Sequence, residues 1–60
     1  MWVELNKATL KDGETYKTCM FMLGVPTMEQ EMMFNRGLWW VGSSGDYTYT
    51  YYSPTHIWKD

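Results

Sequence analysis

The stretch from residue 38 to residue 52, LWWVGSSGDYTYTYY, constrains the fold of this chain more than any other. Two runs of aromatic and β-branched residues flank a turn signal rich in Gly and Ser at residues 42–46. Because neighbouring side chains on a strand point to opposite faces, Tyr47, Tyr49 and Tyr51 share one face of the second run. The alternation predicts a β-hairpin with aromatic side chains on both of its faces.

Trp39 and Trp40 are adjacent on the first run, so they must lie on opposite sides of the hairpin. The pattern does not say which of the two rings faces the interior. A hairpin that is aromatic on both faces needs more packing partners than it can supply itself. We therefore expect the rest of the chain to cover part of it and an external partner to cover the remainder.

Short strands are also expected on either side of this hairpin. Residues 2–5 form the first, and residues 15–23 form a second, which we expect to start near the surface and to end with both faces buried. Residues 24–27 are expected to break this second strand, because a proline cannot donate a ladder hydrogen bond. Residues 55–58 form the last strand.

Residues 27–34 fit either a helix or a strand. Thr27 followed by Gln30 is typical of a capping box, which favours a short helix. The alternative is a strand that ends in a tight turn at residues 35–37, with Gly37 in the left-handed conformation. We favour the strand, because the apolar residues fall on both sides of a helical wheel.

These elements predict one mainly β domain over residues 1–60. We expect an antiparallel meander or a small, partly open barrel of four to six short strands. In the alternative arrangement, residues 27–34 form a single short helix.

The size of the chain suggests how such a domain is stabilised. A domain of 60 residues buries only about 60% of the surface that its unfolded chain exposes. The single Cys excludes an internal disulfide, and one Cys with one His cannot supply the four ligands of a structural zinc site. We expect no metal and no cofactor, and we expect a dense aromatic core supplemented by homo-oligomerisation.

The net charge of −2 argues against several classes of partner. The chain has no run of Lys or Arg, so we expect no binding to duplex nucleic acid. No apolar run approaches the roughly 18 residues of a membrane span. The first residues, MWVELNK, lack the charged-then-apolar order of a secretory signal, so we expect a cytoplasmic protein.

Catalytic chemistry has little support in the sequence. Cys19 and His56 are the only candidate pair of nucleophile and base, and we interpret Cys19 as a small core residue and His56 as a ring that fills a gap near Trp58. Glu29 and Glu31 share a face of a strand, which is typical of a solvated surface. The protein is expected not to be an enzyme.

Four short motifs together resemble a family of short phage and prophage proteins of unassigned function. The motifs are Trp2-Val3-x-Leu5, Asp12-Gly13-Glu14-Thr15 with Cys19, Gly37-Leu38-Trp39-Trp40, and Thr55-His56-Ile57-Trp58. The chain departs from the family where Leu10 replaces a usual Pro, where Ile57 is inserted, and where a Pro-rich tail is missing. The resemblance implies a viral accessory protein in the host cytoplasm, with a small β-rich fold and no known catalytic residues.

We expect a binding function carried by aromatic and polar side chains of the central hairpin and its neighbours. The candidate binding residues are Arg36, Trp39, Tyr47, Tyr49, Tyr51, Tyr52 and His56. The first hypothesis is an inhibitor that occupies a host defence or regulatory protein. The second is an oligomer that sequesters a small nucleotide signal by ring stacking, with Arg36, Lys17 or a Tyr hydroxyl on its phosphates. A structural virion component is a third.

Overall fold

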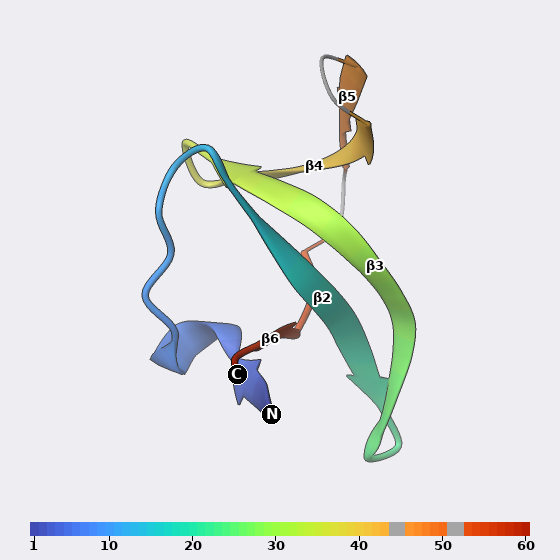
Figure 1. Cartoon of the computed structure of the whole chain (residues 1–60). Coiled ribbons are helices and arrows are strands. Elements are labelled where there is room, and N and C mark those ends of the chain that lie inside the picture. The colour runs from blue at the N-terminus through green and yellow to red at the C-terminus, as the bar shows by residue number, and fades with distance from the viewer. Residues whose placement is uncertain (44–45, 51–52) are drawn as a thin grey trace.

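The computed structural model describes residues 1–43, 46–50 and 53–60, and within them the chain forms one six-stranded antiparallel sheet with a single turn of 3-10 helix (Figure 1). This confirms the mainly β, partly open architecture. In chain order the elements are β1 (Trp2–Glu4), η1 (Leu5–Lys7), β2 (Glu14–Met22), β3 (Val25–Asn35), β4 (Leu38–Ser43), β5 (Asp46–Tyr49) and β6 (His56–Trp58).

The order of the strands across the sheet is β1-β6-β2-β3-β4-β5. Strands β2 to β5 form the expected meander, but β6 returns to lie between β1 and β2. Strand β1 pairs with β6 through Trp2 opposite Trp58 and Glu4 opposite His56. The two ends of the chain meet there: the Met1 amino group donates a hydrogen bond to the Lys59 carbonyl at 2.6 Å, and the Lys59 N–H donates to the Met1 carbonyl at 2.8 Å (Figure 1).

Two tight turns of the same kind join β2 to β3 and β3 to β4. Leu23 and Gly24 have φ of 53° and 77°, and Arg36 and Gly37 have φ of 52° and 78°. Positive φ at both loop residues gives the turn whose twist matches that of the flanking strands. The turn expected at residues 35–37 is confirmed.

The expected break at residues 24–27 is wrong in its position. The chain turns at Leu23-Gly24, and Val25, Pro26 and Thr27 already belong to β3. The expected burial of both faces at the far end of the preceding strand is also wrong, since Met22 is more than half exposed where no other segment of the described chain covers it. Pro26 lies opposite Phe21 and next to the Met22–Val25 pair that closes the turn. At that place in a two-residue hairpin the N–H would point away from the partner strand, so the proline costs no ladder hydrogen bond.

Residues 27–34 form a strand, as favoured, and the helical variant does not occur. The β2–β3 ladder shifts register between Thr18 and Met20, where β3 carries one residue more than β2. Met28 in this bulge has a φ of 52°. A bulge of this kind bends the strand and increases its twist, which accounts for the strong curvature of β3 in Figure 1.

The core lies on one face of the sheet, which we call the inner face. Met32, Trp39 and Ile57 are buried there. The partly buried side chains that pack against them come from the segment before β2 and from β2, β3 and β4: Leu5, Ala8, Leu10, Tyr16, Phe34 and Val41. Trp39 is therefore the core tryptophan, 5% exposed, with its ring centroid 5.0 Å from that of Phe34. Trp40 faces the opposite side, which we call the outer face.

Candidate functional site

The outer face carries a first pair of aromatic rings on β4 and β5. Trp40 and Tyr49 are opposite one another in the ladder, with ring centroids 5.7 Å apart and planes tilted by 53°. Met33 on the neighbouring strand β3 lies opposite Trp40 in the β3–β4 ladder. Tyr49 is 40% exposed, so this end of the outer face offers a ring to solvent. The same register places Tyr47 on the outer face, half-buried and opposite Gly42.

The second pair of rings joins the two ends of the chain. Trp2 and Trp58 meet edge to face, with centroids 5.2 Å apart and planes at 80°. The Lys17 Nζ lies over both rings, 5.7 Å from the Trp2 centroid and 5.3 Å from that of Trp58. An ammonium in this position is attracted to the negative faces of the rings and holds the pair together.

Lys17 also bridges this aromatic pair to β3, because its Nζ lies 3.7 Å from the Glu29 Oε1. Both side chains are about half exposed, so the ion pair itself contributes little stability. The Trp58 indole N–H donates a hydrogen bond to the Asp60 Oδ1 at 3.1 Å. Trp58 remains 40% exposed, so its ring is both fixed and accessible.

The indole N–H of Trp40 has an unusual environment. It is shielded from solvent and meets no acceptor among the described residues. A buried donor without a partner costs about 1–3 kcal/mol, so among the described residues the Trp40 ring is positioned by its packing contacts. Its orientation on the outer face therefore depends on the neighbouring Tyr49 and Met33.

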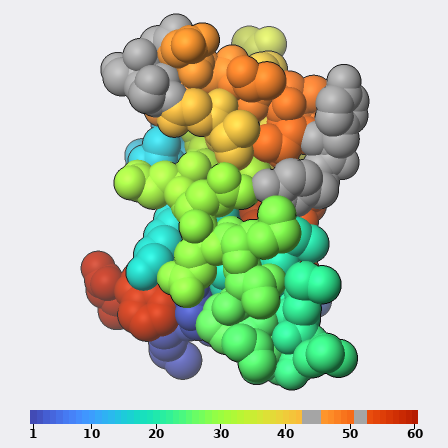
Figure 2. Space-filling model, turned by 90° about the vertical axis from the view of Figure 1, so that its right-hand side faces the viewer, coloured from blue at the N-terminus to red at the C-terminus, as the bar shows by residue number. Residues whose placement is uncertain are grey.

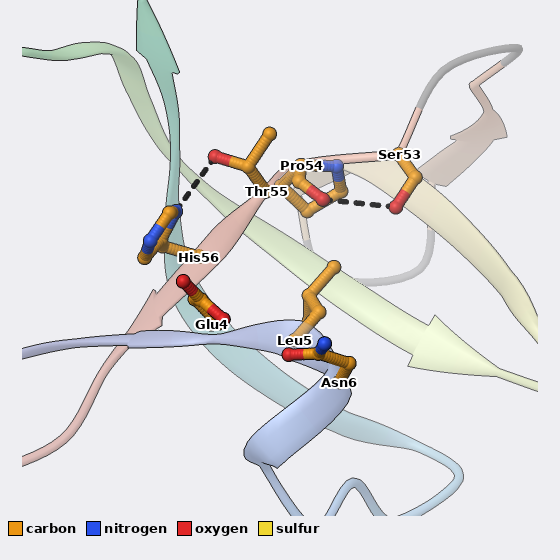
Figure 3. Close-up of a pocket in the computed structure, with 7 residues that line it drawn as sticks. All are labelled: Glu4, Leu5, Asn6, Ser53, Pro54, Thr55 and His56. Carbon is orange, nitrogen blue, oxygen red and sulfur yellow. Dashed lines mark hydrogen bonds between the residues drawn. The ribbon is translucent and has the colours of Figure 1, made fainter. Parts of the chain in front are cut away.

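His56 lies on β6 at the wall of an open cleft of about 430 Å³ between β1 and the segment before β6 (Figure 3). The cleft is lined by Glu4, Leu5, Asn6, Ser53, Pro54, Thr55 and His56. The His56 ring stacks on Phe21 with centroids 4.0 Å apart, and its Nδ1 lies 2.8 Å from the Thr55 Oγ1. That hydroxyl oxygen also accepts the Phe21 N–H at 2.8 Å. His56 therefore has a structural role in tying β6 to β2.

Cys19 and His56 are cross-strand partners, so the fold does bring this candidate pair together. The thiol is fully buried, however, and burial raises the pKa of Cys19, with a further contribution from the negative charge of Glu29. A thiol in such surroundings stays protonated and is a poor nucleophile. The arrangement supports the interpretation of Cys19 as a packed side chain.

The remaining candidate binding residues are spread over the molecule. Trp39 lies in the core and is almost completely buried. Arg36 lies in the β3–β4 turn, where its backbone N–H donates to the Asp12 Oδ1 at 2.9 Å, away from Lys17 in the middle of β2. Tyr51 and Tyr52 lie outside the described residues.

Sequence reasoning missed the Trp2–Trp58 pair with Lys17. Alternation along a strand puts Trp2 with Glu4 on one face of β1 and His56 with Trp58 on one face of β6. Nothing in either segment showed that the two would pair across the whole length of the chain.

The described residues contain no group of three or more His, Cys, Asp or Glu side chains that could hold a metal ion. In the same part of the chain, no helix has the length and apolar character needed to cross a membrane.

Comparison of the chain with protein-family models, with curated proteins and with solved structures finds no match. The resemblance to short phage proteins therefore stays a prediction.

Proposed function

We propose that this protein is a non-catalytic binding protein that attaches to another protein through the outer face of its sheet. In keeping with the phage resemblance, the proposed target is a host protein in the bacterial cytoplasm. Binding of the outer face to this target blocks the activity of the target.

The observation that supports this proposal most is the accessibility of Tyr49 and Trp58. Each is 40% exposed although each is fixed by a neighbouring ring, Trp40 in one case and Trp2 in the other. Rings that are held in place lose little side-chain entropy when they bind, which is why Tyr and Trp are enriched at the energetic centres of interfaces.

The polar residues of the outer face suit a protein partner. Lys17, Glu29 and Glu31 lie between the two aromatic pairs, and all three are exposed. The two carboxylates and the net charge of −2 favour a target with a basic rim, since charge complementarity raises the rate of association.

The nucleotide hypothesis finds less support in the geometry. Lys17 and Arg36 were the basic residues expected to hold phosphates. Lys17 is already engaged by Glu29 and by two rings, and Arg36 lies in a turn at the end of β3. No described arrangement brings the two cations to one ligand.

The test is affinity capture from bacterial lysate with three chains: the unsubstituted protein, the double variant Tyr49→Ser with Trp58→Ser, and Thr9→Ala as a control in an exposed loop. We expect one stoichiometric protein to be retained by the unsubstituted chain and by Thr9→Ala and lost by the double variant. Far-UV circular dichroism checks that the double variant folds. Retention by all three chains, or stabilisation of the protein by a nucleotide in a thermal-shift screen, would contradict the proposal.

A further inference from the structure

The end of the β2–β3 hairpin is apolar and exposed. Met22, Val25 and Met28 are each more than half exposed, and the Leu23 side chain at the turn is fully exposed. This end forms the lower tip of the molecule in Figures 1 and 2, away from β4 and β5. Contiguous apolar side chains at a projecting end mark a contact surface more often than a solvated one.

The hairpin end is also free of charge. No Asp, Glu, Lys, Arg or His occurs from residue 18 to residue 28. Lys17 on β2 and Glu29 on β3 close this span as an ion pair across the two strands, with 3.7 Å between Nζ and Oε1. Everything beyond that pair can be desolvated without burying a charge.

The exposed end continues the inner face. Met20 and Met22 follow Thr18 at alternate positions of β2, and Val25 pairs with Met22. Thr18 is fully buried, Met20 is half-buried and Met22 is 56% exposed. The apolar face therefore extends past the point where the described parts of the chain cover it.

The backbone at this end keeps conformations that its residues disfavour. Leu23 and Met28 have φ of 53° and 52°, a region that suits Gly or Asn. A leucine at the first position of this turn is a local cost, and its fully exposed side chain makes no compensating contact within the described residues. The matching turn carries the same conformation at Arg36, so what distinguishes this end is the apolar character of the exposed Leu23 side chain.

The open edge of β3 is poorly suited to the addition of another strand. Pro26 lacks an N–H at the position that would face an added strand, Met28 lies in a bulge, and Glu29 and Glu31 follow. All three features block edge pairing. A partner must therefore pack on the side chains rather than extend the ladder.

We propose that the ends of two β2–β3 hairpins pack against each other, so that Met22, Leu23 and Val25 of each copy cover those of the other in a two-fold symmetric dimer. A second copy of the chain presents an end that is equally apolar and equally uncharged. Each chain carries a net charge of −2, so two copies repel over most of their surfaces, and the uncharged tip is where they can approach. A symmetric contact needs only a patch that is complementary to itself.

A lipid surface fits this end less well. No basic residue lies between positions 18 and 28 to meet lipid head groups. The unpaired backbone groups along the edges of the hairpin would also have no partners in hydrocarbon. The proposed contact involves only a few side chains per copy, fewer than the roughly 20–30 residues a side of a standard interface, so we expect a dimer that dissociates in the micromolar range.

Sedimentation velocity over low to high micromolar concentrations tests the proposal with three chains. The unsubstituted protein should sediment as a monomer–dimer mixture. Leu23→Asn should raise the dissociation constant at least about tenfold. Its melting temperature, compared at a dilution where both chains are monomers, should be unchanged or higher, because Asn suits the turn. Leu23→Met, which keeps an apolar side chain, should restore the dimer. A melting temperature that falls in Leu23→Asn would show a structural role for Leu23 and would contradict the proposal.

Cross-linking gives a second readout, which reports which part of the surface lies in the contact. Leu23→Cys should form a disulfide-linked dimer under mild oxidation, whereas Arg36→Cys, in the matching turn at the other end of β3, should not. The native Cys19 is fully buried and does not compete. A monomer at every concentration, dimers unaffected by Leu23→Asn, equal cross-linking at both turns, or flotation with phosphatidylcholine vesicles would each overturn the proposal.

Discussion

The two faces of the sheet use the same kinds of residue for different purposes. Trp39 and Trp40 are neighbours on β4, yet Trp39 is buried against Phe34 and Tyr16, whereas Trp40 faces outwards and contacts Tyr49. The inner face is covered by Leu5, Ala8 and Leu10. Aromatic content alone therefore does not distinguish core from contact surface; the distinction depends on which face distant segments of the chain cover.

The same comparison separates rings that stabilise the fold from rings available for binding. Trp39 is 5% exposed and contributes to the core cluster, while Trp58 is 40% exposed and rests on Trp2. If this distinction is correct, substitutions on the inner face should reduce stability strongly, and those on the outer face should reduce it only slightly.

The largest effect is expected for Trp39→Ala. Removing a buried indole leaves a cavity among Met32, Tyr16 and Phe34, and the free energy of unfolding should fall by about 3–5 kcal/mol. In a domain this small that loss approaches the whole stability. Urea denaturation followed by circular dichroism measures it. An equal loss for Trp58→Ala would contradict the distinction between the faces.

A smaller loss is expected for Gly42→Ala on β4. Gly42 has a φ of 146°, and a Cβ there would overlap the backbone carbonyl of Asp46 on the paired strand. Relieving the overlap should cost about 1–3 kcal/mol. The control is Gly37→Ala, which shares a positive φ of 78° but has open space around the added carbon, and should cost about 1 kcal/mol. Denaturation midpoints that rank the two variants in the reverse order would exclude a steric origin.

Trp58→Ala should reduce stability by about 0.5–1.5 kcal/mol, the contribution of an aromatic pair. The lost contacts are those with the Trp2 ring and with the Lys17 ammonium. A thermal melt measures the change. A loss above 3 kcal/mol would show that Trp58 contributes to the core, and would exclude it from the proposed binding surface.

Arg36→Asn should change stability least, and in the favourable direction. Arg36 has a φ of 52° in a two-residue turn, and Asn tolerates this conformation better than Arg. The backbone N–H that bonds to Asp12 is kept. We expect a gain of about 0.5–1 kcal/mol in the free energy of unfolding, measured by the same urea titration. A loss would show that the Arg36 side chain stabilises the fold.

Local patterns were sufficient to predict most strands. Alternation in the segment before Gly24 and in the Tyr-Thr run indicated β2 and β5, and Gly37 marked the turn after β3. The predicted position of the break was wrong because the effect of Pro26 on the ladder depends on which side of the strand its missing N–H would face. That side is set by the position of the turn and not by the proline itself.

Long-range pairing could not be predicted from the sequence. Ile57, considered an insertion between His56 and Trp58, is fully buried in the core because β6 pairs with both β1 and β2. The Trp2–Trp58 contact has the same origin. The choice of Trp39 over Trp40 for the core likewise depends on which face Leu10 and its neighbours cover.

The position of β6 has a consequence for the rate at which this protein folds. Strand β1 reaches the sheet only through β6, and the two hydrogen bonds between Met1 and Lys59 close a loop of 58 positions. The hairpins of β2 to β5 can form from local contacts, but β1 must wait until almost the entire chain has been ordered. We expect the slow kinetic step to be the docking of β6 on β2, because the pairing of Thr18 with Ile57 bears most of the loop-closure entropy and β1 can dock only afterwards.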